Sequence, residues 1–294
     1  MYLRMNWLIV SIVIISSGLV SARGFGIPSD HWGIGFGNTP EFNGLRINFQ
    51  DHNVRQVNGI NITLWKPSEE NINSEINGLS LGLMPGGARL RGVQLGLVGV
   101  AAQESAHGIN MGLLGAGSGG DLRGINIGGV GCGAGDNMTG LNIGGVGCGA
   151  GGDIKGITLA MLGAGAGDKM SGIQISGLGC GAGDELRGIS FSGLGVGSPK
   201  IRGLSFAGGF VGGSDVIGIA MAGGAVLVKD DKGPAEFNGL AVSACNLVKG
   251  TQTGLSIGIV NVADTLNGVQ LGVINVANNN KGIFRILPFL NAHL

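Results

Sequence analysis

One glycine-rich phrase recurs along almost the whole chain. The phrase "GINIGGVGCGAGD" runs from Gly124 to Asp136, and "GLNIGGVGCGAGG" follows sixteen residues later, from Gly140 to Gly152. Each copy starts at an anchor glycine, which is followed by an apolar, a small polar and a second apolar residue. A fixed period of this length indicates a repeat architecture in which each unit packs against its neighbours.

The anchor can be followed through sixteen copies between Gly44 and Gly282. Six consecutive steps are of 16 residues, and the others range from 14 to 21 residues. The anchors are Gly44, Gly59, Gly78, Gly92, Gly108, Gly124, Gly140, Gly156, Gly172, Gly188, Gly203, Gly218, Gly239, Gly254, Gly268 and Gly282.

Apolar residues alternate within each copy in two short runs. In "GLSIGIVNVADTLN", Leu255, Ile257 and Ile259 share one parity, whereas Val260 and Val262 share the other. Alternation indicates strand, and the change of parity indicates a bend between two strand segments. We therefore expect an all-β fold: an elongated parallel β-solenoid of about 16 short coils, with N- and C-terminal caps.

An antiparallel β-meander or an outer-membrane barrel is the alternative, with one strand in each copy. Two observations favour the solenoid. Successive copies match each other directly, whereas a meander would give the strongest similarity between every second copy. Aromatic residues are also sparse after residue 22, with no tyrosine and only Trp32 and Trp65 as tryptophans, whereas membrane barrels carry aromatic girdles.

Glycine accounts for 63 of the 294 residues. Glycine permits positive φ at the corners of a coil, and a coil of 16 residues encloses a thin interior that only small side chains fit. We expect the interior to hold Val146, Cys148, Ala150, Leu178, Cys180 and Ala182. Asparagine recurs before the anchor, where it would form turns or stacked amide ladders; these residues are Asn43, Asn58, Asn77, Asn238 and Asn267.

The N-terminal segment, residues 1–22, has the layout of a secretory signal peptide. Arg4 precedes an apolar run from Trp7 to Ile15, and small residues lead to a cleavage site before Arg23. The alternative is a retained membrane anchor, but the apolar run is shorter than the roughly 20 residues of a spanning helix. Residues 23–43 are predicted to form an N-terminal cap, residues 44–282 the repeat solenoid, and residues 283–294 a C-terminal cap.

Three of the four cysteines, Cys132, Cys148 and Cys180, occupy the same place in the repeat, where the intervening copy has Ala164. Exchange with alanine indicates a small, buried apolar position. We therefore favour free, packed thiols over disulfide bonds; the fourth cysteine, Cys245, lies in a later, divergent copy.

The sequence nominates no catalytic, cofactor-binding or metal-binding residue, and we do not expect an enzyme. Aspartates recur shortly before successive anchors, and we interpret them as solvated turn residues with charge partners such as Arg123 and Lys155, rather than as a metal ladder. They are Asp121, Asp136, Asp153, Asp168 and Asp184. The four histidines lie far apart in the sequence, and the net charge of zero argues against a nucleic-acid partner.

The tandem "GLSIGIVNVADTLNGVQLGVINVA", Gly254 to Ala277, resembles bacterial surface repeat-containing proteins. Their units read glycine-apolar-polar-apolar-glycine-apolar-x-asparagine. The resemblance covers the repeat region and is specific in its last three units, whereas the glycine-cysteine copies between Gly124 and Gly183 depart from it. It implies a cell-surface or exported location and no catalytic residues.

We therefore expect an exported repeat protein, located at the cell surface, in the outer membrane or outside the cell. Its role would be structural, adhesive or partner-binding, with a surface protein or a glycan as the partner. An outer-membrane β-barrel protein is the alternative. Membrane association is expected only for that alternative, or if the N-terminal segment is retained.

Overall fold

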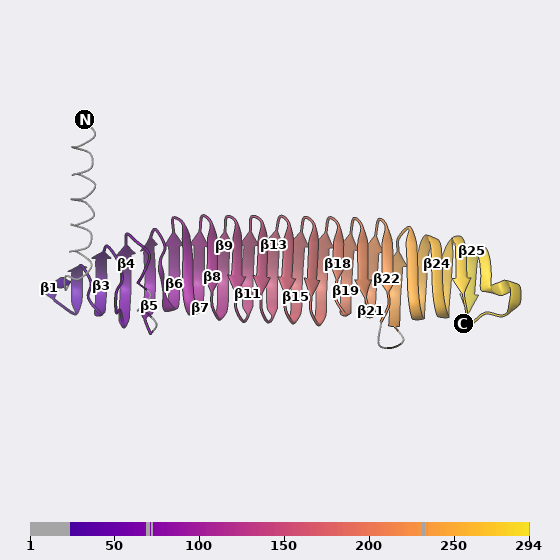
Figure 1. Ribbon diagram of the computed structural model, residues 1–294, viewed down its shortest axis with the longest axis horizontal. Helices are drawn as coiled ribbons and strands as arrows, with labels where there is room; N and C mark the ends of the chain where they lie inside the picture. The colour runs from indigo at the N-terminus through magenta and orange to yellow at the C-terminus, as the bar shows by residue number, and fades with distance from the viewer. Residues whose placement is uncertain (1–23, 69–70, 72, 231–232, 234, 294) are drawn as a thin grey trace, which may run out of the picture. The chain divides into compact units, whose positions relative to one another are not determined.

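The computed structural model describes residues 24–68, 71, 73–230, 233 and 235–293; the predicted signal peptide lies outside the described residues. The fold is a parallel β-solenoid of about 13 turns, which confirms the predicted fold class. The chain divides into two compact units, Met1–Asp136 and Asn137–Leu294. Within each unit, strands of successive coils lie side by side (Figure 1).

In the first unit, a sheet of long strands faces a sheet that contains shorter strands. The long strands pair parallel from β2 through β7 to β9, and β7 also pairs with β8, which pairs with β10. The N-terminal strand β1 instead forms an antiparallel hairpin with β2. The strands are β1 Phe25–Ser29, β2 Trp32–Phe36, β3 Glu41–Asn48, β4 Gln56–Thr63, β5 Glu75–Gly82, β6 Gly86–Gly96, β7 Gly99–Gly112, β8 Gly115–Ser118, β9 Asp121–Gly128 and β10 Gly131–Ala134.

In the second unit, long and short strands alternate along the chain and form separate parallel ladders. The long strands are β11 Met138–Gly144, β13 Ile154–Ala160, β15 Lys169–Ser176, β17 Glu185–Ser192, β19 Lys200–Ala207, β21 Asp215–Ala222 and β23 Ala235–Val242. The short strands are β12 Gly147–Ala150, β14 Gly163–Ala166, β16 Gly179–Ala182, β18 Gly195–Gly197, β20 Phe210–Gly213 and β22 Ala225–Val228. The extended strand β24, Cys245–Ala277, continues both ladders.

Successive coils are in register, so that the anchor glycine of one coil pairs with the anchor glycine of the next. Gly140 lies opposite Gly156, and Gly156 lies opposite Gly172. This parallel stacking excludes the antiparallel meander and the barrel that were the alternatives. The sixteenth copy, at Gly282, does not form a coil: it is a 3-10 helix, Gly282–Arg285, followed by β25, Ile286–His293, which pairs antiparallel with β24.

The coil interior contains both large apolar and polar side chains. Large apolar side chains two positions before the anchor are fully buried, and so are polar side chains at the second position after it. In four successive coils these residues are Met138, Ile154, Met170 and Leu186, with Asn142, Thr158, Gln174 and Ser190, all at 0% exposure. The apolar residues at the first and third positions after the anchor therefore point outward, since side chains alternate across a strand.

The prediction of small interior residues is confirmed at four positions and wrong at two. Cys148, Ala150, Cys180 and Ala182 are buried. In contrast, Val146 and Leu178 are 46% and 52% exposed. The physical reason is that these two residues lie at bends between a long and a short strand, so the alternation that directs strand side chains inward does not apply to them.

The short strands direct their small side chains inward and their glycines outward. In β12 and β14, Cys148 and Ala164 are buried, whereas Gly147, Gly163 and Gly165 are partly exposed. A β-carbon added at Gly165 would find its nearest neighbour 3.9 Å away. The outer face of β12 and β14 therefore has almost no side chains, whereas the later short strand β20 carries Phe210, which is 46% exposed.

The cysteines differ in their bonding. Cys132 and Cys148 are disulfide-bonded, whereas Cys180 and Cys245 are free thiols among the described residues. The prediction of free thiols is thus wrong for Cys132 and Cys148, because burial of a position does not exclude a bond there. Within the second unit, Cys180 lies in register between Ala164 and Val196, neither of which offers a sulfur partner.

Asparagines before the anchor form the expected amide ladder in the first unit. Asn58 donates to Asn43 at 2.8 Å, and Asn77 donates to Asn58 at 2.9 Å. In the same unit Arg46 takes the polar position after the anchor and is fully buried, forming an ion pair with Asp51. Burial lowers the Arg46 pKa to about 10, and its partner is needed because an uncompensated buried charge is strongly destabilising.

Candidate functional site

Two rows of apolar side chains cover the outer face of the long-strand sheet in the second unit. Each row takes one residue from every coil, and the members lie in register across the parallel ladders. The first-position row consists of Leu141, Ile157, Ile173, Ile189, Leu204, Ile219, Leu240 and Leu255. The third-position row consists of Ile143, Leu159, Ile175, Phe191, Phe206, Met221, Val242 and Ile257. We call these two rows together the apolar face.

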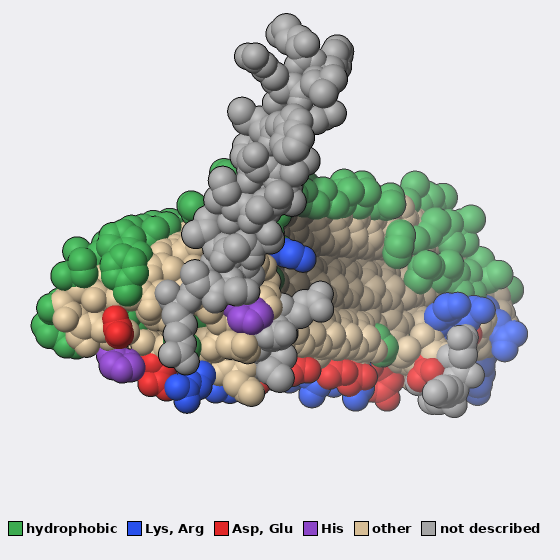
Figure 2. Space-filling view, turned by 60° about the vertical axis from the view of Figure 1, so that its left-hand side comes forward, with side chains coloured by type: hydrophobic (Ala, Val, Ile, Leu, Met, Phe, Trp, Pro, Cys, Tyr) green, Lys and Arg blue, Asp and Glu red, His purple; other side chains and the backbone are tan. Residues whose placement is uncertain are grey.

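The apolar face is accessible although its residues are large. Ile157 is 42% exposed, Ile175 45% and Phe191 43%. In Figure 2, exposed hydrophobic side chains gather apart from the charged ones. An exposed apolar surface that extends across several coils is typical of protein or membrane interaction sites.

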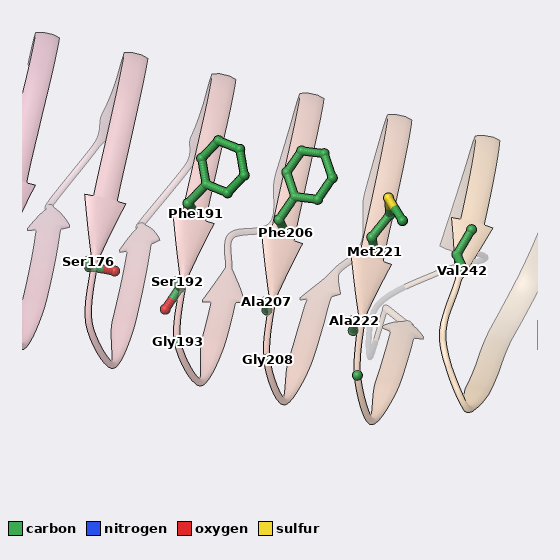
Figure 3. Close-up of a pocket in the computed structure, with 11 residues that line it drawn as sticks. Ser176, Phe191, Ser192, Gly193, Phe206, Ala207, Gly208, Met221, Ala222 and Val242 are labelled. Atoms are coloured by element: carbon green, nitrogen blue, oxygen red, sulfur yellow. The ribbon is translucent and has the colours of Figure 1, made fainter.

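A shallow groove of about 480 Å³ runs beside the third-position row, across several coils (Figure 3). One side of the groove is a ridge formed by Phe191, Phe206 and Met221. The other side is formed by the bends that contain Gly193 and Gly208. Because these glycines have no side chains, the groove stays open beside the ridge.

The two phenylalanines of the ridge are stacked on each other. The ring centroids of Phe191 and Phe206 are 4.7 Å apart and the ring planes differ by 7°. The in-register ladder imposes this arrangement, because neighbouring strands lie roughly 4.8 Å apart. Each ring thus turns one face towards the other ring, so the stack offers edges and flanks to a partner more than flat faces.

Two serines supply the polar groups of the groove. Ser192 Oγ donates a hydrogen bond to the Leu178 carbonyl oxygen at 2.6 Å. Ser176 is only 4% exposed, and its Oγ has no hydrogen-bond partner among the described residues. The groove therefore combines an apolar wall with one uncommitted hydroxyl.

Charged side chains on the long strands near the apolar face neutralise one another. Lys155 Nζ lies 2.8 Å from Asp153 Oδ2. Arg202 Nε lies 3.2 Å from Glu185 Oε1, and Arg202 Nη2 lies 2.8 Å from Asp215 Oδ2. The hydrogen bond from Lys155 is the main cause that lowers the pKa of the Asp153 carboxyl. These pairs give the rim of the face little net charge.

The predicted aspartate row is partly confirmed. Asp121 pairs with Arg123 at 2.6 Å, and Asp153 pairs with Lys155 as expected. The remaining members, Asp136, Asp168 and Asp184, are exposed residues outside the strands. Among the described residues, no group of three or more His, Cys, Asp and Glu side chains is placed to hold a metal ion.

With this geometry established, the comparisons with known proteins add no relative. No protein-family model, no curated protein and no solved structure matches the chain. Within the described part of the chain, no helix has the length and apolar character needed to cross a membrane.

Sequence reasoning missed the apolar face, although a signal for it was present. A buried polar residue at the second position requires its first- and third-position neighbours to point outward, as Ile173 and Ile175 do around Gln174. Different copies have Asn, Gln, Ser or Thr at the second position after the anchor. This pattern is typical of stacked polar side chains in the interior of the coils, but it is equally typical of solvated turns. Only the burial of Gln174 and its counterparts in other coils distinguishes the two.

Proposed function

We propose that this protein is an exported, cell-surface repeat protein with a structural and partner-binding role. The solenoid serves as a scaffold, and the apolar face of the second unit is the surface to which a partner protein binds. No step of this function requires catalytic chemistry.

The main support for the proposal is that polar side chains of the repeat point inward, whereas apolar side chains point outward. Polar residues such as Gln174 and Ser190 are at 0% exposure, whereas the apolar residues Ile175 and Phe191 beside them are 45% and 43% exposed. Exposing these side chains to water forfeits roughly 1.5–3 kcal/mol for each one that is left fully unburied. Their recurrence in coil after coil is explained by a surface that becomes covered.

The sequence supports the location. Residues 1–22 have the layout of a secretory signal peptide. The tandem from Gly254 to Ala277 resembles the repeats of bacterial surface proteins. Both features favour export to the cell surface.

The ridge favours a protein partner over a glycan. Sugar rings bind proteins by lying on exposed aromatic faces, but Phe191 and Phe206 direct faces towards each other. Aliphatic side chains such as Ile175 and Met221 flank this stack in register. Such a surface suits apolar side chains, which pack against it without polar groups.

Surface labelling tests the location. Intact cells of the source organism are treated with a membrane-impermeant amine reagent, and the protein is then recovered and examined for label on lysines such as Lys155, which is exposed. We expect labelling at a level similar to that of a known surface protein. Recovery of unlabelled protein from intact cells, with labelling only after lysis, would contradict the proposal.

Binding is tested with a matched pair of variants. Phe191→Glu places a charge on the apolar face, whereas Phe210→Glu places one on a short strand, at a phenylalanine of similar exposure, 46% against 43%. We expect Phe191→Glu to abolish binding to surface proteins and Phe210→Glu to leave it intact. Equal binding by both variants would exclude the apolar face as the binding surface.

A further inference from the structure

We infer that the partner of the apolar face is a second copy of this chain, so that two second units pack sheet against sheet. This inference rests on the proposed partner-binding role and specifies its partner.

The shape of the face fits a copy of itself. The ridge of Phe191, Phe206 and Met221 lies directly beside the groove bounded by Gly193 and Gly208 (Figure 3). Ridge and groove have the same repeat, since both take one residue from each coil. In a two-fold arrangement the ridge of each copy enters the groove of the other, which is how an isologous interface pairs one patch with itself.

The area of the face is sufficient for a stable dimer. The anchors from Gly140 to Gly254 mark the eight coils of the apolar face, which at roughly 4.8 Å each extend over about 38 Å. The apolar face and the charged rim before the anchors together occupy the outward positions of a long strand, which cover about 20 Å at roughly 3.3 Å per residue. The product, about 760 Å² with the rim included, is close to the roughly 800 Å² that each partner contributes to an interface of standard size.

The charges around the face also permit self-association. The basic groups of Lys155, Arg187 and Arg202 lie one position before the anchor and are held by the acidic groups of Asp153, Glu185 and Asp215 on the same sheet. Two identical faces can therefore meet without a concentration of like charge, and the ion pairs form a polar rim along the edge of the apolar face that precedes the anchors. An anionic lipid surface is less well matched, because these basic groups are already neutralised.

The experiment is analytical ultracentrifugation of the full mature chain. The wild-type protein, Phe191→Glu, Phe206→Glu and the control Phe210→Glu are compared from about 1 to about 100 μM. We expect the wild type and Phe210→Glu to sediment as dimers. Burial of a charge at a central contact costs about 2 kcal/mol or more. The dissociation constant of the dimer should therefore be at least about 30-fold higher for each ridge variant than for the wild type.

Circular dichroism confirms that each variant keeps its strand content, and a variant that loses it is replaced by Phe191→Ser or Phe206→Ser. A monomeric wild type at the highest concentration would overturn the inference. Dissociation of Phe210→Glu to the same extent as the ridge variants would also overturn it, because the contact would then not be the apolar face.

The proposed function and this inference fail in different ways. If the wild type is monomeric but Phe191→Glu still abolishes binding to another surface protein, the partner-binding role stands and the second copy is excluded. If the monomer instead floats with vesicles of anionic lipid and Phe191→Glu does not, the occupant of the face is a membrane.

Discussion

Gly156 lies so close to Gly140 of the neighbouring coil that a β-carbon on Gly156 would come within 2.2 Å of the Gly140 carbonyl oxygen. Gly156 also has a φ of +117°, which L side chains rarely adopt. The same two constraints recur at anchor after anchor. The repeat of the anchor glycine is therefore a steric requirement of the stacked coils.

We expect Gly156→Ala to lower the free energy of unfolding by about 2–4 kcal/mol, because it adds both backbone strain and a clash. Gly165→Ala is the matched control in the next short strand, where a β-carbon would lie 3.9 Å from the nearest atom. It should change stability by at most about 1 kcal/mol, in the stabilising direction. Urea denaturation compares the free energies of unfolding of the two variants. Equal losses of stability would contradict the conclusion that a glycine is sterically required at Gly156 and not at Gly165.

The buried asparagine ladder near the C-terminus provides a second prediction. Asn246 donates to Asn261 Oδ1, and Asn261 donates to Asn275 Oδ1, both at 2.7 Å. All three side chains are at 0% exposure. Asn261→Ala leaves the buried Asn275 Oδ1 without its donor, at a cost of about 1–3 kcal/mol, and removes one of the two acceptors of Asn246 Nδ2, which keeps its hydrogen bond to the Ile257 carbonyl oxygen.

We therefore expect Asn261→Ala to lower the melting temperature clearly. Asn278→Ala is the control, because the Asn278 hydrogen bond to Asp264 is exposed and should contribute less than about 1 kcal/mol. A melting temperature for Asn261→Ala as high as that of the control would show that the ladder contributes little to stability.

The thiols should differ in reactivity. Burial raises the pKa of the Cys180 thiol from 9.0 to about 11, so the fraction of reactive thiolate at neutral pH falls by about 100-fold. We expect iodoacetamide to label Cys180 at least about 100-fold more slowly in the native protein than in the denatured protein. Peptide mass spectrometry measures both rates, and labelling of Cys180 at the same rate in both states would exclude its burial.

The same experiment checks the disulfide assignment. In denatured protein without reductant, Cys180 and Cys245 should react, whereas Cys132 and Cys148 should become reactive only after reduction. Labelling of all four cysteines without reductant would restore the expectation of free thiols that the repeat pattern favours.

The stability of the first unit should depend on pH through His107. Partial burial is the main cause that lowers the His107 pKa below 6.5, and the positive charges of Arg123 and Arg91 add to it, while Asp121 acts in the opposite direction. The Nε2 atom has no hydrogen-bond partner among the described residues. Below pH 6.5 the unfolded state therefore binds more protons at this histidine than the folded state does.

The free energy of unfolding should therefore decrease as the pH falls from 6.5 towards the lowered pKa of His107. Above pH 6.5 the contribution of His107 to the free energy of unfolding should not change with pH. His107→Gln removes the titrating group and should flatten this part of the stability profile. Denaturation at several pH values measures the effect, and identical slopes for both proteins between pH 7 and pH 5 would contradict it.

The sequence by itself determined the period, the strands and the parallel stacking. Direct similarity between successive copies predicts that equivalent residues of neighbouring coils lie opposite each other, as Gly140, Gly156 and Gly172 do. The exchange of Cys and Ala at one position likewise predicts the burial of Cys148 and Ala164. These features were predictable because they depend on the spacing along the chain.

Only the tertiary structure decided which way the side chains point. Alternation in a strand separates two sets of residues but does not say which set lies inside, because that depends on how the two sheets of a coil close on each other. The closure places Gln174 inside and Ile175 outside, and it places Leu178 at an exposed bend. The apolar face follows from contacts between coils, which no single copy of the repeat contains.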